Sequence, residues 1–317
     1  MLHKTTSNKL KIISGTAHPD LSKEIAKYLS LDLTPVTTKK FSDGETFVRI
    51  DESVRGCNIF IIQPTCSPVN ESLMELLITI DALKRASAAT INIVVPYFGY
   101  SRQDRKAKGR EAITAKLVAD MVGKAGTDRV IAMDLHSGQL QGFFDVRVDH
   151  LNAIPVILNY IQSKNYSDIV VVSPDTGGVA RASALAKRLN VPIAVINKER
   201  PDHNQVEVLN IVGNVKDRTA IIIDDMIDTA STLCRGADAL KSAGASQIVA
   251  CATHPVFSGQ AIYKLASSDI NEIVVTNTIP LAQEAKLVHK ITQLSVASIF
   301  AEAINRIYNN LSVSEIF

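Results

Sequence analysis

Residues 220–232 read AIIIDDMIDTAST, and the architecture expected for the whole chain follows from this segment. It begins with a β-branched run, reaches two adjacent acids, Asp224 and Asp225, and leads into a helical pattern, CRGADALKSAG. A run that is apolar on both faces is typical of a strand in a parallel sheet, because helices cover both sides of such a sheet. The segment therefore predicts a strand, a loop and a helix in direct succession.

Eight further β-branched runs have the same character, and segments with helical periodicity separate many of them. These runs are KIISG (11–15), NIFIIQ (58–63), INIVVP (91–96), RVIAMD (129–134), DIVVVSP (168–174), IAVIN (193–197), QIVACA (247–252) and EIVVTN (272–277). One helical stripe consists of Leu73, Leu76, Leu77, Ile80 and Leu83. Buried strands that alternate with helices predict an α/β fold with doubly wound, mostly parallel sheets.

An internal repeat is suggested by KRASAATINIVVPYFGYSRQ, which begins at Lys84, and KSAGASQIVACATHPVFSGQ, which begins at Lys241. Each passes from a helix end through a small-residue turn and a buried strand to a Pro-containing loop. Any two α/β units share some of these features, and two related domains are the sharper interpretation. At about 100–200 residues per domain, two domains are expected. We place them at residues 1–150 and 151–317.

Composition excludes several classes of protein. The formal net charge of +2 argues against a broad basic surface for nucleic acid. The four cysteines are scattered along the chain, which favours a reducing and cytoplasmic compartment. They are Cys57, Cys66, Cys234 and Cys251. The N-terminus, MLHKTTSNKLKIISG, lacks the apolar region of a secretory signal, and no run reaches the ~18 apolar residues that span a bilayer. We expect neither a nucleic-acid nor a membrane partner.

The loop at residues 228–232 predicts a phosphate site. Its members are Asp228, Thr229, Ala230, Ser231 and Thr232. A helix that begins after a strand offers free backbone N–H groups and the positive end of its dipole to a phosphate dianion, and the hydroxyls add donors. Asp224 and Asp225 suit the vicinal hydroxyls of a sugar, since ligands of open α/β sheets bind at the carboxyl ends of strands. A simple N-cap would explain only one acid and one threonine.

Two more strand ends carry candidate groups for anions. In VVVSPDTGGVARA (170–182), Asp175 can bind a metal through oxygen, and paired glycines let the backbone approach an oxyanion. In NKERPDHNQVEV (197–208), Lys198 and Arg200 can neutralise charge if this loop closes over a triphosphate. The ordinary alternatives are a strand-turn-helix connection and a solvated charged surface loop.

A nucleotide site is suggested by FSDGE (41–45) and SRQDRKAKGR (101–110). Phe41 can stack on adenine, while Asp43 and Glu45 can accept hydrogen bonds from its amino group. The second segment holds five cations after a buried strand, which suits a triphosphate. Taken alone, the first segment is more typical of an exposed turn and the second of a solvated basic loop.

MDLHSGQLQGFFD (133–145) places Asp134 and His136 just beyond a buried strand. Residues at i and i+2 project to the same side of an extended segment. Magnesium prefers oxygen ligands, and a lone histidine at a strand end is more often a hydrogen-bonded structural residue. The residues alone therefore leave a metal site and a structural role open.

Together, these motifs resemble those of the ribose-phosphate pyrophosphokinases. DDMIDTAST is similar to the phosphoribosyl-pyrophosphate loop that this family shares with type I phosphoribosyltransferases, and D-L-H-x-x-Q-x-Q-G-F-F-D is a signature of the family. The resemblance implies a type I phosphoribosyltransferase-like fold in both domains. It implies transfer of the pyrophosphoryl group of Mg-ATP to the anomeric hydroxyl of ribose 5-phosphate, giving phosphoribosyl pyrophosphate and AMP. It also implies Mg²⁺ as cofactor and a homo-oligomer, typically a hexamer, that serves nucleotide biosynthesis.

The resemblance assigns roles to individual residues. They are Lys198 and Arg200 for catalysis; His136 and Asp175 for the metal; Phe41, Asp43, Gly44, Glu45, Arg102, Gln103 and Asp104 for ATP; Arg200, Asp224, Asp225 and residues 228–232 for ribose 5-phosphate; and Asp175, Thr176, Gly177 and Gly178 for the pyrophosphate loop. Residues 1–150 would supply ATP and metal groups, and residues 151–317 the sugar-phosphate and catalytic loops. The chain departs from the family at Ser231, Glu199 and Ala112, where Gly, Arg and Pro are usual.

Two alternatives remain within reach of these motifs. A phosphoribosyltransferase shares the DDMIDTAST loop, but it needs no ATP site, so RQDRK and FSDGE argue against it. A non-catalytic regulatory paralogue would depart at the catalytic loop, where Lys198 and Arg200 are intact. A P-loop kinase is excluded because G-x-x-x-x-G-K-[ST] does not occur.

Overall fold

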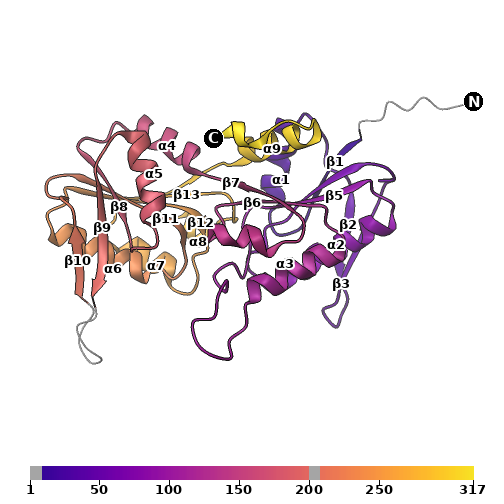
Figure 1. The fold of residues 1–317 in the computed structure, drawn as a ribbon, viewed down its shortest axis with the longest axis horizontal. Helices are drawn as coiled ribbons and strands as arrows, with labels where there is room; N and C mark the ends of the chain where they lie inside the picture. The colour runs from indigo at the N-terminus through magenta and orange to yellow at the C-terminus, as the bar shows by residue number, and fades with distance from the viewer. Residues whose placement is uncertain (1–8, 200–207) are drawn as a thin grey trace, which may run out of the picture. The chain divides into compact units, whose positions relative to one another are not determined.

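The computed structural model describes residues 9–199 and 208–317, which form two compact units (Figure 1). One unit is the described part of Met1–Asn152 together with Val296–Phe317, and the other is Ala153–Ser295. The expected division at residue 150 placed the last segment in the second half of the chain. It groups with the first unit because α9 (Ala297–Tyr308) packs against α1 (Pro19–Tyr28).

The first unit is built on a parallel sheet in the order β1-β4-β5-β6-β7. Its elements, beside α1 and α9, are β1 (Leu10–Ser14), β2 (Val36–Lys40), β3 (Thr46–Ile50), β4 (Asn58–Ile62), α2 (Val69–Arg85), β5 (Thr90–Val95), α3 (Thr114–Ala125), β6 (Arg129–Met133), η1 (Gly138–Phe143), β7 (Arg147–Leu151) and η2 (Val313–Ile316). Helices α2 and α3 lie on one side of this sheet, and α1 and α9 on the other (Figure 1). The antiparallel hairpin β2–β3 packs against α2.

Burial on both faces explains the unbroken apolar runs. In β4, Ile59 and Ile61 join the core beneath α2 and α3. Phe60 and Ile62, which alternate with them, are also fully buried. Successive side chains of a strand point to opposite faces, so a sheet covered on both sides requires apolar residues at every position.

The second unit is built on a sheet in the order β10-β9-β8-β11-β12-β13-β14, in which only β10 is antiparallel to its neighbour among the described strands. Its elements are α4 (Ile154–Ser163), β8 (Ile169–Ser173), α5 (Val179–Leu189), β9 (Ile193–Glu199), β10 (Val208–Val212), β11 (Thr219–Ile227), α6 (Ser231–Ser242), β12 (Gln247–Pro255), α7 (Ala261–Ser267), β13 (Glu272–Thr276), α8 (Gln283–Lys286) and β14 (Ile291–Leu294). All nine predicted strands are present across the two units.

The two units share one topology. The order β1-β4-β5-β6-β7 corresponds to β8-β11-β12-β13-β14, and the hairpin β2–β3 falls in the chain where β9–β10 falls in the second unit. Even the parallel pairing of β9 with β8 has a remnant, the single bridge between Ile12 and Leu33. The predicted internal repeat is confirmed, because the stretches that begin at Lys84 and Lys241 lead into the equivalent strands β5 and β12.

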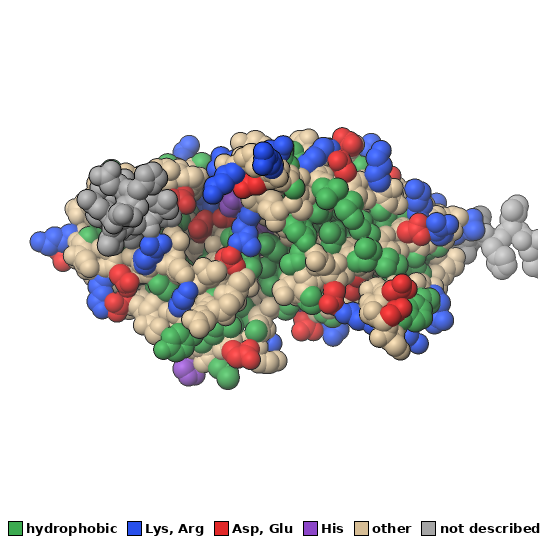
Figure 2. All heavy atoms as spheres, turned by 90° about the horizontal axis from the view of Figure 1, so that it is seen from below, with side chains coloured by type: hydrophobic (Ala, Val, Ile, Leu, Met, Phe, Trp, Pro, Cys, Tyr) green, Lys and Arg blue, Asp and Glu red, His purple; other side chains and the backbone are tan. Residues whose placement is uncertain are grey.

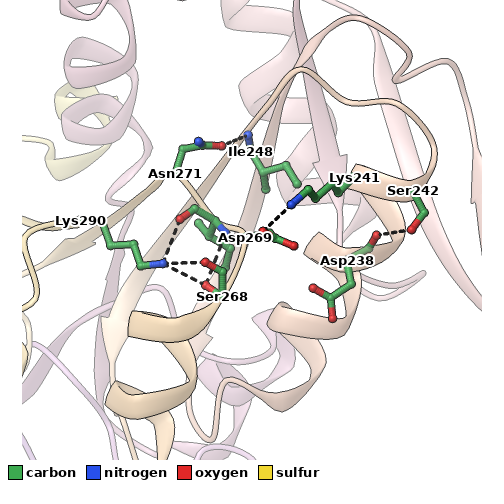
Figure 3. A network of polar contacts seen from close by, with 9 residues as sticks. Asp238, Lys241, Ser242, Ile248, Ser268, Asp269, Asn271 and Lys290 are labelled. Carbon is green, nitrogen blue, oxygen red and sulfur yellow. Dashed lines mark hydrogen bonds and ion pairs between the residues drawn. The ribbon is translucent and has the colours of Figure 1, made fainter.

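A polar network ties together the amino-terminal edge of the second sheet (Figure 3). Lys241 of α6 pairs with Asp269 at 2.6 Å, and the Asn271 side chain accepts a hydrogen bond from the Ile248 N–H at 2.8 Å. The Lys290 ammonium donates to the carbonyl of Ser268 at 2.8 Å, directly after α7. These contacts fix the ends of α6 and α7 that lie away from the carboxyl ends of the strands.

No helix within residues 9–199 and 208–317 combines the length and the apolar character that crossing a bilayer requires.

Packing of α9 on the first unit predicts a large effect at Phe300, whose side chain is fully buried. We expect Phe300→Ala to lower the free energy of unfolding by about 3–5 kcal/mol, because it removes a large apolar side chain and leaves a cavity. Urea unfolding followed by circular dichroism measures this change. Leu311→Ala is the control: that side chain is 55% exposed, so its loss should change stability by less than about 0.5 kcal/mol. Equal losses in the two variants would contradict the packing of α9.

Candidate active site

The strands β8 and β11 part just before the candidate residues. Pairing of β11 with β8 stops at Ile222, whereas its pairing with β12 continues through Ile227. The strand order also reverses here, because the chain runs from β8 outward to β9 and then returns to β11 on the other side. Ligands of open α/β sheets bind at such a switch point. The predicted strand ended at Asp225, and the observed one is longer because β12 continues to pair with it.

A pocket of about 200 Å³ opens at this point. Its lining residues are Pro174, Asp175, Asp224, Met226, Ile227, Asp228, Thr229, Ala230, Ser231, Thr232, Leu233 and Cys251. The structure thus brings the 228–232 loop, Asp224 and Asp175 together. Asp225 was expected beside them at the sugar, but it is buried and is not among the lining residues.

The 228–232 loop is shaped to receive an anion. Backbone N–H groups of Phe257 and Ser258 donate to the carbonyls of Ile227 and Asp228, both at 3.0 Å, and hold the start of the loop. Ala230 then adopts a left-handed conformation with φ 60°, and α6 begins at the next residue. The N-cap residue Ala230 has no side-chain acceptor for the first-turn N–H groups of α6, and such groups can bind an anion.

An arginine that the sequence analysis missed lies against the acid pair. The Arg181 Nη1 of α5 is 3.3 Å from Asp224 Oδ1 and 3.6 Å from Asp225 Oδ1. Burial, followed by the neighbouring charge of Asp225, raises the pKa of Asp224 to about 7, and Arg181 partly opposes that rise. In the sequence, Arg181 was indicated only by its position about one helical turn after Gly178.

The 174–178 turn forms the other wall of the pocket. The Ser173 hydroxyl donates to the Asp175 carbonyl at 2.6 Å, and the Gly178 N–H donates to Asp175 Oδ1 at 3.0 Å. A side chain at position 178 would lie 2.9 Å from the Ser173 hydroxyl, so this position requires glycine. Thr176 and Gly177 are exposed at the tip of the turn. One carboxylate oxygen of Asp175 therefore stabilises the turn, and Asp175 also lines the pocket.

The first residues of the predicted catalytic loop lie in a strand. Lys198 and Glu199 belong to β9, where the backbone of Lys198 pairs with that of Leu209 in β10. The expectation of a loop from residue 197 onward is therefore wrong for these positions, because the hairpin pairing extends to them. Arg200 lies outside the described residues.

In the first unit, the turn after β6 differs from the expected extended segment. Asp134 has φ 38° and is buried, whereas His136 is exposed. The left-handed residue breaks the alternation of side chains, so the two do not project to the same side. His150 Nε2 accepts a hydrogen bond from the N–H of Leu135 at 2.9 Å and holds this turn.

The turn that carries His136 is joined to the basic loop. The Ser137 hydroxyl donates to Asp104 Oδ2 at 2.8 Å. The Thr114 hydroxyl donates to Gln103 Oε1 at 2.5 Å, which ties the same loop to α3. A second pocket, of about 250 Å³, is lined by Val69, Asn70, Tyr97, Gly99, Tyr100, Arg102 and Gln103. Candidate ATP residues and the candidate metal ligand His136 therefore lie on adjoining segments.

The FSDGE segment forms an exposed turn between β2 and β3. The Phe41 N–H donates to the Glu45 carbonyl at 2.8 Å, and Gly44 takes a positive φ of 94° that favours glycine. Phe41 is 57% exposed and meets Phe47 edge-on, with ring centroids 6.0 Å apart. Asp43 accepts a hydrogen bond from the Glu45 N–H at 3.1 Å. The hydrogen bonds of this turn therefore lie within its own hairpin.

The donor set fits a metal that arrives with its substrate. Within residues 9–199 and 208–317, no three His, Cys, Asp or Glu side chains converge on one point. Magnesium usually binds through one or two carboxylates together with waters and substrate phosphates, without a complete protein cage. Asp175 offers such a carboxylate in the second unit, and His136 offers a ring nitrogen in the first.

The fold and its pockets define a two-domain α/β protein of the type I phosphoribosyltransferase-like class. The N-terminal domain of ribose phosphate pyrophosphokinase matches residues 10–126, and the phosphoribosyl synthetase-associated domain matches residues 204–317. A phosphoribosylpyrophosphate synthetase structure from Mycobacterium smegmatis is similar with a TM-score of 0.90 and 43% identity, covering 95% of this chain and 99% of that one.

Curated relatives agree over nearly the full length. Ribose-phosphate pyrophosphokinases from Synechococcus elongatus and Oceanobacillus iheyensis are each 53% identical to this chain, cover 98% of it, and are themselves covered over 94% and 98% of their lengths. Ribose-phosphate pyrophosphokinase 2, chloroplastic, from Arabidopsis thaliana is 54% identical over 98% of this chain and 78% of its own. The chain belongs to the ribose-phosphate pyrophosphokinase family, and it is accordingly a transferase of diphosphate groups.

The raised pKa of Asp224 makes stability depend on pH. Because this pKa rises from 3.8 to about 7 on folding, the stability that the protonated carboxyl contributes is lost as pH rises through that window. Asp224→Asn cannot ionise, so we expect its melting temperature to exceed that of the unchanged protein by more at about pH 8 than at about pH 4. Asp238→Asn, at an exposed position of α6, is the control. A pH-independent difference for Asp224→Asn would show that the carboxyl is not strained by burial.

Proposed function

We propose that the chain transfers the β,γ-pyrophosphoryl group of Mg-ATP to the anomeric hydroxyl of ribose 5-phosphate, giving phosphoribosyl pyrophosphate and AMP. The pocket between β8 and β11 carries this proposal, because it combines an uncapped helix N-terminus with the carboxylate of Asp224. A phosphate dianion suits the first, and sugar hydroxyls suit the second. Family membership supports the same pair of substrates.

The roles of the second unit follow from this placement. The 5-phosphate would bind the N–H groups of the first turn of α6 and the hydroxyls of the 228–232 loop. Asp224 would accept hydrogen bonds from the ribose hydroxyls, and the 174–178 turn would hold the transferred pyrophosphate. The anomeric oxygen loses its proton to solvent and forms a bond to the β-phosphorus as the bond from that phosphorus to the α,β-bridging oxygen breaks, and AMP leaves with the bridging oxygen. Lys198 and Arg200 would stabilise the charge that develops during this transfer.

The first unit would supply the nucleotide side. Arg102, Gln103 and Asp104 lie on a loop with five cations, which suits a triphosphate. His136 and Asp175 would hold Mg²⁺, which lowers the negative charge on the phosphates when it is bound. Catalysis would then consist mainly of positioning and electrostatic stabilisation.

A homo-oligomer, of the family's hexameric type, would complete the adenine site. Phe41 is 57% exposed, on the same hairpin turn as the other candidate adenine residues Asp43 and Glu45. Figure 2 shows hydrophobic side chains gathered over the first unit. The exposed large apolar side chains of that unit include Met74 of α2 and Leu117 of α3. A second copy of the chain would cover such a surface. The free thiols of all four cysteines are consistent with the proposed cytoplasmic location.

AMP release tests the proposal directly. Incubation with ribose 5-phosphate and Mg-ATP should yield AMP and phosphoribosyl pyrophosphate in equal amounts, measured by ion-pair chromatography. A phosphoribosyltransferase or a non-catalytic paralogue would release no AMP from this mixture. Formation of ADP in place of AMP would show transfer of a single phosphoryl group and would refute the proposed reaction.

Lys198 should matter for the transferring group and little for substrate binding. We expect Lys198→Ala to lower kcat by about 10²–10³-fold with KM changed only slightly, because the lost charge acts mainly in the transition state. Steady-state rates of AMP release measure both constants. Lys187→Ala removes an exposed lysine from α5 and should leave both unchanged. Unchanged kcat in Lys198→Ala would remove this residue from the mechanism.

Phe41 should act on the nucleotide alone. We expect Phe41→Ala to raise KM for ATP by about tenfold, since stacking on a base is worth about 1–3 kcal/mol, and to leave KM for ribose 5-phosphate unchanged. Tyr28→Ala is a matched control, because it removes another exposed aromatic of the first unit, 64% exposed. An equal rise in both Michaelis constants would indicate a general loss of structure and would contradict the stacking role.

A further inference from the structure

Lys264 of α7 contacts the candidate phosphate loop from behind. Its Nζ donates a hydrogen bond to the Ser231 hydroxyl oxygen at 2.7 Å. Ser231 lines the pocket between β8 and β11, whereas Lys264 does not. The ammonium group therefore reaches the first residue of α6 without entering the space that a ligand would fill.

The position of Lys264 is fixed by packing. Helix α7 lies against α6, and Cys234 Sγ contacts the Lys264 carbonyl at 3.7 Å. At the far end of α7, Lys290 donates to the Ser268 carbonyl and hydroxyl at 2.8 and 3.4 Å (Figure 3). These contacts hold the backbone of α7, from which the Lys264 side chain extends toward Ser231.

The ammonium group of Lys264 donates its hydrogen bond to a neutral hydroxyl, that of Ser231. Within the described part of the chain, Lys264 forms no ion pair with an Asp or Glu side chain. By contrast, Lys241 at the other end of α6 is paired with Asp269 at 2.6 Å. The Lys264 charge adds to the positive end of the α6 dipole, and both favour an anion in the pocket.

The hydrogen bonds around Ser231 also direct its hydroxyl proton. The oxygen accepts from Lys264 at 2.7 Å and, more weakly, from the Thr229 hydroxyl at 3.4 Å. With its lone pairs engaged in this way, the O–H is left to donate toward the pocket. A cation that donates to a hydroxyl polarises it and strengthens the bond that the hydroxyl itself donates.

We propose that Lys264 is a positioning residue that acts through Ser231 on the 5-phosphate of ribose 5-phosphate. In this relay, Lys264 donates to the Ser231 oxygen, and the Ser231 hydroxyl donates to a phosphate oxygen. The inference rests on the proposed function, because it requires the sugar phosphate to bind at α6. It also accounts for a side chain at position 231, where glycine would offer no such donor.

The relay makes a quantitative expectation for two variants. Lys264→Met should raise KM for ribose 5-phosphate by about five- to tenfold with little change in kcat, because the Ser231 contact to the substrate loses its charge-assisted support. Ser231→Ala should give a similar rise, and the double variant should be no worse than either single one, because both changes break the same chain of contacts. Lys264→Arg keeps a donor and should retain most of the affinity.

Controls separate the relay from net charge and from folding. Lys241→Met removes a cation from the opposite end of α6 and should leave KM for ribose 5-phosphate within about twofold of the unchanged protein. The melting temperature of each variant should differ from that of the unchanged protein by no more than the melting temperature of Lys241→Met does. A lower KM in Ser231→Gly would show that the serine crowds the phosphate and would overturn the proposal. Additive effects of Lys264→Met and Ser231→Ala would overturn it as well.

Calorimetric titration with ribose 5-phosphate alone distinguishes this inference from the proposed reaction. If the protein binds ribose 5-phosphate but releases no AMP from ATP, the proposed function fails. The dissociation constants of Lys264→Met, Ser231→Ala, the double variant and Lys264→Arg still test the relay. If the effects of Lys264→Met and Ser231→Ala on the dissociation constant add fully in the double variant, the relay is rejected even if AMP release is normal. Absence of any binding by the unchanged protein would reject both.

Discussion

The site depends on the early separation of β8 from β11. Because β11 leaves β8 at Ile222 and stays with β12 through Ile227, its carboxyl end has an open side. Parallel strands place the loops that follow them at one edge of the sheet, together with the N-termini of the next helices. The 174–178 turn and the 228–232 loop consequently face the same pocket, although about fifty residues of chain separate them. If β8 and β11 remained paired to their ends, the two loops would not border a common pocket.

The acid pair shows how this pocket trades stability for binding. Asp224 is raised to a pKa of about 7 by burial and by the charge of Asp225, and Arg181 relieves only part of that strain. A bound sugar would donate hydrogen bonds to the ionised carboxylate and stabilise it. The site is therefore least favourable when empty, which is the expected condition of a pocket built for a polar ligand.

The buried strands were predictable because a sheet covered on both faces favours apolar residues at successive positions, and polar residues such as Asn92 are the minority there. Edge strands were harder: β7 reads RVDHL and β14 reads ITQL, and their mixed composition follows from partial exposure. Motifs indicated most residues that line the pocket, since strand-loop-helix order alone brings them to one edge. Arg181 and Lys264 were missed, because on their own helices they look like ordinary charged residues and their roles arise only from tertiary contacts. The turn at Asp134 was misjudged because one left-handed residue reverses the direction of a side chain.

The shared topology allows the turns after β1 and β8 to be compared. In the first unit, the turn after β1 takes the place of the 174–178 turn, but a buried carboxylate already occupies it. Glu75 of α2 accepts a hydrogen bond from the Thr16 N–H at 2.8 Å and another from the Thr16 hydroxyl. Gln63 accepts from the Ala17 N–H at 3.1 Å beside it. Backbone donors that would face a ligand anion in the second unit are thus satisfied from within the chain. The second unit has a pocket at its strand ends, between β8 and β11. The first unit presents a different surface, the β2–β3 hairpin and the basic loop that are proposed to bind the nucleotide.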